Sequence, residues 1–588
     1  MLLSAATAIR WWAFETGRTG FDGDEAITCL MARDIWLGQN YPIFFYGQSY
    51  CGAITSYYTA AFFWARGAAD AVTVRLASAV LMLAVFGFFY AFARWAAGRK
   101  AALAALAILA FAPGYFAVWS LKMRGNYALL PALAAAILWP AMALDERIRK
   151  GRPGARWLAA ALGFAIGLGW WNDRQVVFAI GGVVLWQAWH WARWFGQGNV
   201  AWRLARALLM AGLAGAFVVS LGRPLPVSSE RFGPAAVALI RLSAIPLLGA
   251  LLALAGEWNS PGRLRGSWAA GVAACLIGYL PALVFMAGGQ ETTTQFFPAS
   301  LKQIADNLCS IVTQMLPGLL GLAFNVEEGG FAAPLLSVLF LVLLVSAVCS
   351  AIASARSPSP PSAYEGRRLR DFLWLMALSS AVALSAQVLS GYTPYLLGDP
   401  RHLSLLVYAL AATCGVGWAP LCEWLKRRAP RLPAGLIAAA ILAIHGVSSV
   451  IALPPDPLDA AHVPVRYEKL LSYLRSKGVR ACYMMDHALG RGYWEAMELT
   501  FYTGTHIRFV PPIVGDRLPA NAEFARRQQR PAVWVTRFPR DLVENYVRCF
   551  ERPQDVVVED VGEYHVVFSG ETERMYDLVY RLVRESAP

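Results

Sequence analysis

Three carboxylate side chains crowd into four consecutive positions near the start of the chain. Asp22, Asp24 and Glu25 lie in residues 21–26, directly after a first apolar segment. Carboxylates at the mouth of an apolar helical bundle are costly to remove from water, so they tend to pair, bind a ligand or take part in chemistry. Asp and Gly also favour turns, so the stretch could be turn chemistry alone. The rest of the chain decides between these two interpretations.

The composition indicates a polytopic membrane protein. Only 15% of the 588 residues are charged and 57% are hydrophobic, whereas a soluble domain carries about 25% charged residues. The formal net charge of +14 could indicate nucleic-acid binding. However, the Lys and Arg residues fall mostly in short loops between apolar runs, which is the pattern that orients membrane helices. Nucleic acid is therefore not expected as a partner.

About thirteen apolar segments within residues 1–454 predict a bundle of transmembrane helices. The first, residues 1–12, is interrupted by Arg10 and is shorter than the roughly 20 residues that span a bilayer. Twelve more are expected at about 71–93, 101–119, 126–144, 157–171, 175–192, 204–221, 235–256, 268–287, 332–354, 372–390, 403–420 and 434–453.

Two long loops interrupt this series of segments. Residues 16–70 are rich in aromatic side chains, and residues 26–37 are expected to form an amphipathic helix along the membrane interface. Residues 288–331 are expected to hold another interfacial helix near 299–316. Because the basic residues fall in every second loop, both long loops, the 391–402 loop and the C-terminal tail are predicted on the non-cytoplasmic side.

The tail, residues 455–588, has ordinary charge density and predicts a small soluble α/β domain. Helical periodicity at 467–475 precedes strand-like runs at 479–484, 533–535 and 556–558. The nine cysteines show no spacing typical of a metal site. Two disulfides are left open, Cys29 with Cys51 and Cys482 with Cys549.

With this topology, charged side chains collect on the non-cytoplasmic side. Four cations lie there at the ends of helices, where a purely structural protein needs few: Lys122, Arg124, Arg174 and Arg401, the last beside His402. Cations beside carboxylates suit a substrate with an anionic lipid phosphate, because Arg offers forked donors and Lys a point charge. Each of these side chains could instead simply extend to the polar membrane interface, without binding a ligand. Because four such cations lie beside an acidic loop, a functional role is favoured over four isolated interfacial side chains.

The order of these motifs resembles the GT-C membrane glycosyltransferases, in particular the bacterial aminoarabinose transferases of lipid A and the protein O-mannosyltransferases. The resemblance covers most of the chain. It rests on Asp24-Glu25 in a long first outer loop, on Tyr46-Gly47-Gln48, and on residues 119–125 after the third span. It implies a GT-C bundle of about thirteen helices in a bacterial cytoplasmic membrane, with the C-terminal domain in the periplasm. A Glu-Lys-Pro-Pro signature of the aminoarabinose branch is absent, which leaves the sugar open.

The resemblance also implies roles for individual residues. Asp24 matches the catalytic Asp of the family, with Glu25 beside it and Asp22 in reserve. The cations expected to bind the lipid phosphate are Lys122, Arg124, Arg401 and Arg174. The residues expected to contact substrate are Tyr46, Gln48, Tyr50, His402 and Glu291, with His402 standing where the family has Tyr.

The implied reaction moves a sugar, with inversion, from a polyprenyl-phosphate donor in the membrane lipid to a hydroxyl of a glycan, lipid or protein acceptor. No metal cofactor is required, because the lipid phosphate is already charged and no nucleotide diphosphate has to be bound, although the carboxylates could hold a divalent cation. Two other classes stay open, a transporter or flippase of a lipid-linked glycan intermediate and a non-catalytic scaffold of envelope assembly. Charges at the outer surface rather than in mid-span, and the lack of a visible internal repeat, favour the transferase.

Overall fold

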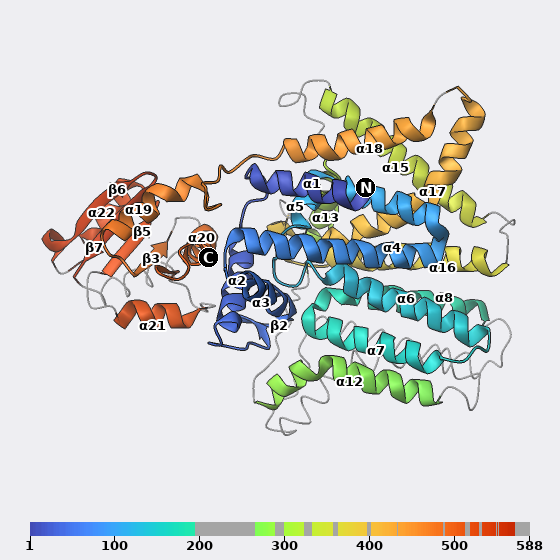
Figure 1. The fold of residues 1–588 in the computed structure, drawn as a ribbon, viewed down its shortest axis with the longest axis horizontal. Coiled ribbons are helices and arrows are strands. Elements are labelled where there is room, and N and C mark those ends of the chain that lie inside the picture. Colours follow the sequence, from blue (N-terminus) through green and yellow to red (C-terminus); the bar gives the residue numbers. More distant parts are fainter. Residues whose placement is uncertain are drawn as a thin grey trace.

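The computed structural model describes residues 1–194, 265–288, 299–322, 332–356, 363–396, 401–431, 433–485, 489–511, 518–527, 532–548, 550 and 552–570. A helical bundle forms one part of the molecule and a unit of strands and helices lies beyond one of its ends (Figure 1). The two predicted spans at 204–221 and 235–256 lie outside the described residues, as does Glu291.

The first long loop of the sequence is a folded layer between the bundle and the sheet unit (Figure 1). After α1 (Leu2–Glu15), Asp22 begins α2 (Gly23–Trp36) by accepting a hydrogen bond from the Glu25 amide at 3.1 Å. An antiparallel hairpin of β1 (Phe44–Phe45) and β2 (Gln48–Gly52) then leads to α3 (Ile54–Arg66).

Helix α2 is buried rather than interfacial. Residues 25–32 are all buried, and α2 packs against α3 on one side and against α20 (Leu489–Tyr502) on the other. The expectation of an amphipathic helix at 26–37 on the membrane interface is therefore wrong. The physical reason is tertiary packing: α3 and α20 cover the helix, and its polar residues Glu25 and Thr28 are buried together with the apolar ones.

The bundle consists of long apolar helices. Its described members are α4 (Ala71–Ala110), α5 (Gly114–Trp119), α6 (Leu130–Arg149), α7 (Ala155–Asn172), α8 (Val177–Trp194), α12 (Arg265–Ala287), α15 (Ala332–Arg356), α16 (Ala363–Val388), α17 (Ser404–Arg428) and α18 (Ala434–Ile451). Five stretches are long and apolar enough to cross a membrane by length and composition: Ala71–Ala110, Ala269–Ala287, Ala333–Arg356, Gly366–Val388 and Arg401–Arg428. The total of thirteen spans stays a prediction.

Gly98 divides α4 into two helical segments. Its φ of +86° is open to glycine but strained for other residues. The buried Arg10 guanidinium lies over Phe86 of the first segment and donates to the Ala110 carbonyl oxygen of the second at 2.9 Å. The two segments therefore run side by side, as the two spans expected at 71–93 and 101–119 require.

A short helical stretch follows Ser300, near the position expected from the sequence. Ser300 and Gln303 form a reciprocal capping box that begins α13 (Leu301–Ser310). A π-helical turn, Ile311–Met315, continues it into α14 (Leu316–Leu320). The Asn307 amide donates to the carbonyl oxygens of Val388 and Ser390, which holds this stretch against the end of α16.

The tail forms a mixed sheet of five strands with the order β4-β3-β5-β7-β6. Strand β3 (Ala481–Met485) pairs in parallel with β4 (Arg508–Val510) and β5 (Ala532–Thr536), while β7 (Tyr564–Ser569) pairs antiparallel with β5 and β6 (Val557–Val561). Its helices are α19 (Glu468–Ser476), α20, α21 (Pro519–Arg527) and α22 (Arg540–Val547). Strands β3, β5 and β6 and the first helix lie close to where strand-like runs and helical periodicity predicted them, whereas β4 and β7 were not predicted.

The sheet unit and the first loop share one hydrophobic core. Phe21, Leu30 and Met31 belong to the same buried cluster as Leu471 and Val535 of the tail. The domain boundary predicted at residue 455 stays a prediction, because this core spans both sides of it. Cys29 and Cys51 are free thiols, so the disulfide left open between them is not formed. Cys482 is also a free thiol, and Cys549 lies outside the described residues.

Candidate functional site

The loop between α5 and α6 brings two cations onto the amino end of α2. Lys122 Nζ lies 2.9 Å from Asp22 Oδ2, and Arg124 Nε lies 3.4 Å from Asp22 Oδ1. Burial would raise the pKa of Asp22, but Lys122 and Arg124 outweigh burial and hold that pKa well below its ordinary value. Because Asp22 also accepts the hydrogen bond that begins α2, its carboxylate is ionised and has three partners.

Asp24 lies between two arginines that come from distant parts of the chain. Its Oδ2 is 3.2 Å from Arg124 Nε and 3.6 Å from Arg401 Nη1. Arg401 begins the short 3₁₀ turn that precedes α17. Asp24, Arg124 and Arg401 have side chains that are 14–18% exposed, so they are largely enclosed but not sealed. We call Asp22, Asp24, Lys122, Arg124 and Arg401 the charged cluster.

Glu25 is placed differently from its two acidic neighbours. It is fully buried and forms a two-pronged ion pair with Arg75 of α4, which is 1% exposed; Arg75 Nη2 lies 2.9 Å from Glu25 Oε2. Glu25 Oε1 also accepts the Met123 amide at 2.7 Å, and Arg75 donates to the Leu121 carbonyl oxygen at 2.9 Å. The pair therefore fixes the α5–α6 loop on α2, so that Lys122 and Arg124 face the carboxylates.

Sequence reasoning missed Arg75, although a signal was present. A charged residue inside an apolar span is expensive unless it is paired, and its partner is expected nearby. Arg75 lies in the segment predicted as the second span, so the acidic loop was its natural partner. Two threonines complete the anchoring, because the Gly125 amide donates to Thr28 Oγ1 at 3.0 Å and Thr55 Oγ1 donates to the Gly125 carbonyl oxygen at 2.7 Å.

Aromatic rings support the arginines of the charged cluster. The Arg124 guanidinium lies 5.0 Å from the Trp119 ring centre and that of Arg401 lies 5.8 Å from Tyr127. The His402 ring packs edge-on against Tyr127, with centroids 5.6 Å apart. Such cation–π contacts hold a guanidinium in place without using its hydrogen-bond donors. His402, predicted to contact substrate, thus lies next to the charged cluster.

An apolar pocket begins at these same rings. Trp119 and Tyr127 line it together with residues of α4, α5, α6 and α17, among them Met82, Phe116 and Tyr408. Its open space is about 440 Å³. The pocket therefore extends from the charged cluster into the apolar part of the bundle.

The turn between α7 and α8 adds buried polar groups beside the cluster. The Tyr127 hydroxyl lies close enough to Arg124, Arg401 and Asp173 for their charges to act on it. Burial raises the pKa of Asp173 to about 7, against the opposing effects of the Gln175 amide and of Arg174. A carboxyl with such a pKa suits acid–base chemistry near neutral pH.

Two buried amides near this turn have no hydrogen-bond partner among the described residues. Asn126 is 2% exposed and Asn172 is not exposed at all, and neither the oxygen nor the nitrogen of either side chain is paired there. Buried polar atoms are nearly always paired, so such groups suit a ligand with hydroxyl groups. The guanidinium of Arg174, predicted to bind phosphate, lies 4.6 Å from the ring centre of Trp170 in the same turn.

Tyr46 of the hairpin, predicted to contact substrate, lies further from the cluster. The Tyr46 hydroxyl donates to Asp34 Oδ2 at 2.6 Å. Asp34 follows Asp24 by ten residues on the same helix, a separation of about 15 Å at 1.5 Å per residue. Gln48 and Tyr50 lie half-buried on β2, whose last residue packs against Asn172. Glu291 lies outside the described residues.

Helix α20 of the tail contacts the acidic loop directly. A methyl group on Gly23 would lie 2.6 Å from the Trp494 Cα, so only glycine permits this approach between Asp22 and Asp24. Burial raises the pKa of Glu498, one turn further along, to about 8, and the charge of Asp22 contributes to that rise. Glu498 accepts a hydrogen bond from the Tyr467 hydroxyl at 2.8 Å. The tail therefore forms one wall of the site.

The charged cluster is poorly suited to a metal ion. Asp22 and Asp24 would be its carboxylate ligands, but both already face cations of the cluster. Within the described part of the chain, no group of three His, Cys, Asp or Glu side chains is arranged to hold a metal.

No protein-family model matches the chain, and no curated protein matches it. The chain is similar to the structure of the archaeal oligosaccharyltransferase AglB from Archaeoglobus fulgidus in complex with an inhibitory peptide and a dolichol-phosphate, with 14% identity and a TM-score of 0.44. That match covers 81% of this chain and 58% of the oligosaccharyltransferase. The chain therefore spans little more than half the length of that protein.

A second kind of solved structure matches over nearly its whole length. ArnT from Cupriavidus metallidurans bound to undecaprenyl phosphate is 15% identical, with 96% of this chain and 97% of that chain covered and a TM-score of 0.38. Another structure of the A. fulgidus oligosaccharyltransferase, with Zn and sulfate, is 12% identical over 91% of this chain and 68% of that chain, with a TM-score of 0.46. At such identities and TM-scores these likenesses assign no residue, substrate or reaction to this chain.

Proposed function

We propose that the chain is a membrane glycosyltransferase that moves a sugar from a polyprenyl-phosphate donor to a hydroxyl acceptor, with inversion at the anomeric carbon. The observation that carries this proposal is the charged cluster at the mouth of an apolar pocket. Two carboxylates, three cations and an apolar cavity are the groups that a charged lipid phosphate and a hydroxyl nucleophile require. We propose that this end of the bundle and the tail face the periplasm of a bacterial cell.

The cations of the cluster are proposed to bind the lipid phosphate. Lys122, Arg124 and Arg401 outnumber Asp22 and Asp24, so the cluster keeps a net positive charge that attracts an anion. Arginine offers forked donors to phosphate oxygens and lysine a point charge. As the bond to the sugar breaks, negative charge grows on the phosphate, and cations already in position lower the barrier.

The apolar pocket is proposed to hold the first isoprene units of the donor. Its Trp119 and Tyr127 rings carry Arg124 and Arg401 on one side and line the pocket on the other. A phosphate at the arginines therefore places the attached prenyl chain against Met82 and Phe116. Burying apolar chain surface there adds about 25 cal/mol per Å² to the affinity.

Asp24 is proposed as the general base. It takes the proton of the acceptor hydroxyl while the oxygen attacks the anomeric carbon, and the sugar–phosphate bond breaks with its electron pair on the lipid phosphate. General-base catalysis is typically worth about 10²–10⁴-fold. Asp22 suits this role less well, because it begins α2 and pairs with Lys122 and Arg124. Glu25 is buried against Arg75, so we propose that it positions the loop rather than contacts substrate.

The buried polar groups beside the cluster are proposed to contact the sugar. Asn126 and Asn172 have donors and acceptors to offer, and sugar hydroxyls need both. His402 lies against Tyr127 and Arg174 lies over Trp170, and we propose that both face the sugar. Gln48, Tyr50 and Glu291 stay proposals, and Tyr46 is held by Asp34, away from the cluster.

A panel of undecaprenyl-phosphate sugars tests the proposal with the purified protein in lipid. Membrane extract serves as acceptor, and release of undecaprenyl phosphate is measured for the wild type, Asp24→Asn, Asp173→Asn and the control Asp541→Asn, which alters an exposed aspartate in α22. We expect release from one donor, and a loss of about 10²-fold or more in Asp24→Asn alone. Loss in Asp173→Asn but not in Asp24→Asn would assign the base to Asp173. If the protein moves the lipid-linked donors across the membrane without cleaving the sugar–phosphate bond, the proposed transferase activity is wrong and the protein is a transporter.

A further inference from the structure

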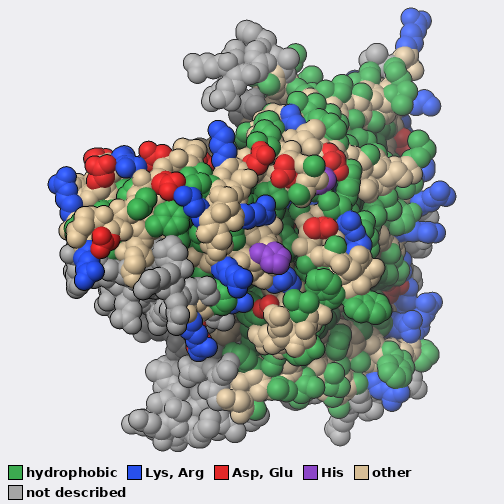
Figure 2. All heavy atoms as spheres, turned by 60° about the vertical axis from the view of Figure 1, so that its left-hand side comes forward, with side chains coloured by type: hydrophobic (Ala, Val, Ile, Leu, Met, Phe, Trp, Pro, Cys, Tyr) green, Lys and Arg blue, Asp and Glu red, His purple; other side chains and the backbone are tan. Residues whose placement is uncertain are grey.

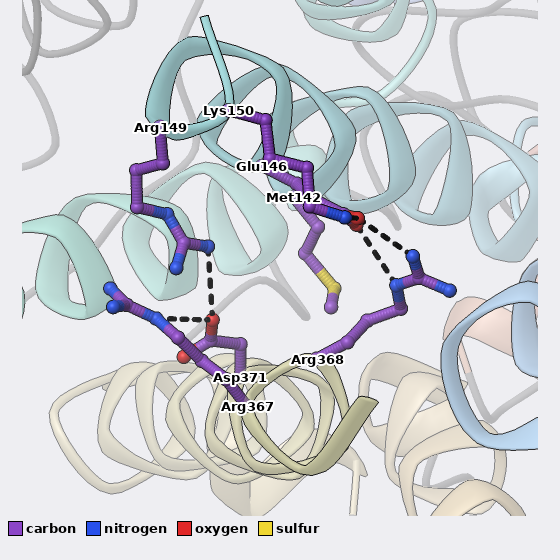
Figure 3. Close-up of a pocket in the computed structure, with 7 residues that line it drawn as sticks. All are labelled: Met142, Glu146, Arg149, Lys150, Arg367, Arg368 and Asp371. Atoms are coloured by element: carbon purple, nitrogen blue, oxygen red, sulfur yellow. Dashed lines mark hydrogen bonds and ion pairs between the residues drawn. The ribbon is translucent and has the colours of Figure 1, made fainter. Parts of the chain in front are cut away.

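A second charged pocket lies at the other end of the bundle. It is formed by the carboxyl end of α6 and the amino end of α16 (Figure 3). Helix α6 begins next to the charged cluster and has 20 residues, so its far end is about 30 Å away at 1.5 Å per residue. The surface at this end of the bundle carries many Lys and Arg side chains, with a mainly hydrophobic surface between it and the sheet unit (Figure 2).

The side chains that line this pocket carry excess positive charge. Figure 3 shows four cations around two carboxylates: Arg149, Lys150, Arg367 and Arg368 around Glu146 and Asp371. Glu146 is shared, because Arg368 donates to both of its oxygens, at 2.7 and 2.9 Å, and Lys150 pairs with it as well. Asp145 outside the lining also pairs with Arg149, at 2.5 Å. Three carboxylates leave the four cations with a net charge of about +1.

Asp371 leaves two of these arginines incompletely paired. Its Oδ1 faces the Trp186 indole at 3.3 Å and His190 at 3.0 Å. Its Oδ2 is 3.6 Å from Arg149 and 3.7 Å from Arg367, which is beyond hydrogen-bond range. The buried Nε of Arg367 has no hydrogen-bond partner among the described residues. Both guanidinium groups therefore have donors to offer within one small pocket.

The surroundings of the pocket suit a group at the membrane surface. The Arg368 guanidinium lies 4.7 Å from the Trp95 ring centre and donates to the Trp95 carbonyl oxygen at 3.1 Å. The rings of Trp189 and Trp374, from α8 and α16, contact each other in a tilted arrangement with centroids 5.6 Å apart, and both side chains are more than 40% exposed. Exposed tryptophans of this kind mark the level of lipid headgroups, with acyl chains on their apolar side.

We propose that this pocket binds a phosphate group, and that an anionic phospholipid headgroup supplies it. The phosphate accepts hydrogen bonds from Arg149 and Arg367 and compensates the excess charge, while the acyl chains lie on Trp189 and Trp374. Basic pockets between membrane helices bind phospholipid headgroups in this way. The proposal is independent of the transferase reaction, because no residue of the charged cluster takes part in it.

Native mass spectrometry of the purified full chain tests the site. The protein is titrated with phosphatidylglycerol, with phosphatidylcholine as the zwitterionic lipid and inorganic phosphate as the soluble probe. The test variant is Arg367→Gln, which removes the arginine with the weakest contact to the fold. The control is Arg427→Gln, which makes the same charge change at an exposed residue near the end of α17. Unfolding temperatures confirm that both variants fold, and Arg149→Gln replaces the test variant if Arg367→Gln does not.

We expect one tightly held phosphatidylglycerol per chain in the wild type and in Arg427→Gln, with affinity about tenfold lower in Arg367→Gln. Phosphatidylcholine should bind without this difference. If inorganic phosphate binds and depends on Arg367, but phosphatidylglycerol does not bind in this way, the pocket is a phosphate site whose ligand is a soluble phosphate and not a lipid headgroup. Equal binding of both lipids, or equal losses in the test and control variants, would overturn the proposal.

Discussion

The change Glu25→Gln separates a positioning role from a chemical one. Glu25 and Arg75 are buried against each other, and Glu25 also holds the Met123 amide at 2.7 Å. Glutamine keeps one oxygen for that amide but leaves the Arg75 charge buried without a counter-charge. Removing one partner of a buried ion pair costs about 3–5 kcal/mol, and we expect about 3 kcal/mol because part of the hydrogen bonding survives. The α5–α6 loop should loosen at the same time.

Unfolding in detergent–lipid micelles measures the stability, and release of lipid phosphate measures the activity. If Glu25 only positions the loop, Arg75→Met should cost activity as much as Glu25→Gln does, although Arg75 has no access to substrate. The double variant Glu25→Gln/Arg75→Met should recover part of the stability, because it removes both charges of the buried pair and leaves neither charge unpaired. A fully stable Glu25→Gln protein without activity, beside an active Arg75→Met, would refute this reasoning and give Glu25 a chemical role.

Three further changes test neighbouring contacts. Arg124→Gln should weaken binding of undecaprenyl phosphate about tenfold or more, because a hydrogen bond to a charged group is worth about 1.5–3 kcal/mol; affinity within twofold of wild type would contradict the phosphate site. Gly23→Ala places a methyl 2.6 Å from the Trp494 Cα, so it should lower stability by about 1–3 kcal/mol and increase hydrogen exchange in α20, whereas unchanged exchange would show that α20 does not press on the loop. Burial raises the pKa of Glu498 to about 8, while an unfolded glutamate releases its proton near pH 4.3, at about its ordinary pKa. The folded state therefore holds this proton longer, so the wild type should lose stability from about pH 5 to 8 and Glu498→Gln should lose less; parallel stability curves would contradict this pKa.

Much of the fold could be predicted, because its signals are local. Apolar runs of spanning length and basic loops indicate membrane helices without knowledge of packing, and the β-branched run at 533–535 became β5 within one residue at each end. The expectation of an interfacial helix failed at α2, which is buried between α3 and α20 although it carries several charged residues. Its cover comes from α20, some 460 residues later, and no local pattern shows that contact.

The same distinction holds for the candidate site. The five residues of the charged cluster are predictable from their charge and their position on the non-cytoplasmic side of the predicted topology. The structure brings their side chains together. The partner of Glu25 and the approach of Trp494 to Gly23 depend on tertiary packing, which the sequence does not display. The family resemblance, which rests in part on Tyr46-Gly47-Gln48, implies a substrate contact for Tyr46. Its hydroxyl instead pairs with Asp34, ten residues along α2 from Asp24.

The central claim is that Asp24 acts as a base and not as a phosphate ligand. The measurement that tests it most directly compares donor affinity with single-turnover release of lipid phosphate in Asp24→Asn. We predict release slowed by about 10²-fold or more, with donor affinity unchanged or tighter, because Arg124 and Arg401 lose a competing carboxylate. Release at the wild-type rate, or a loss explained entirely by weaker donor binding, would contradict the claim.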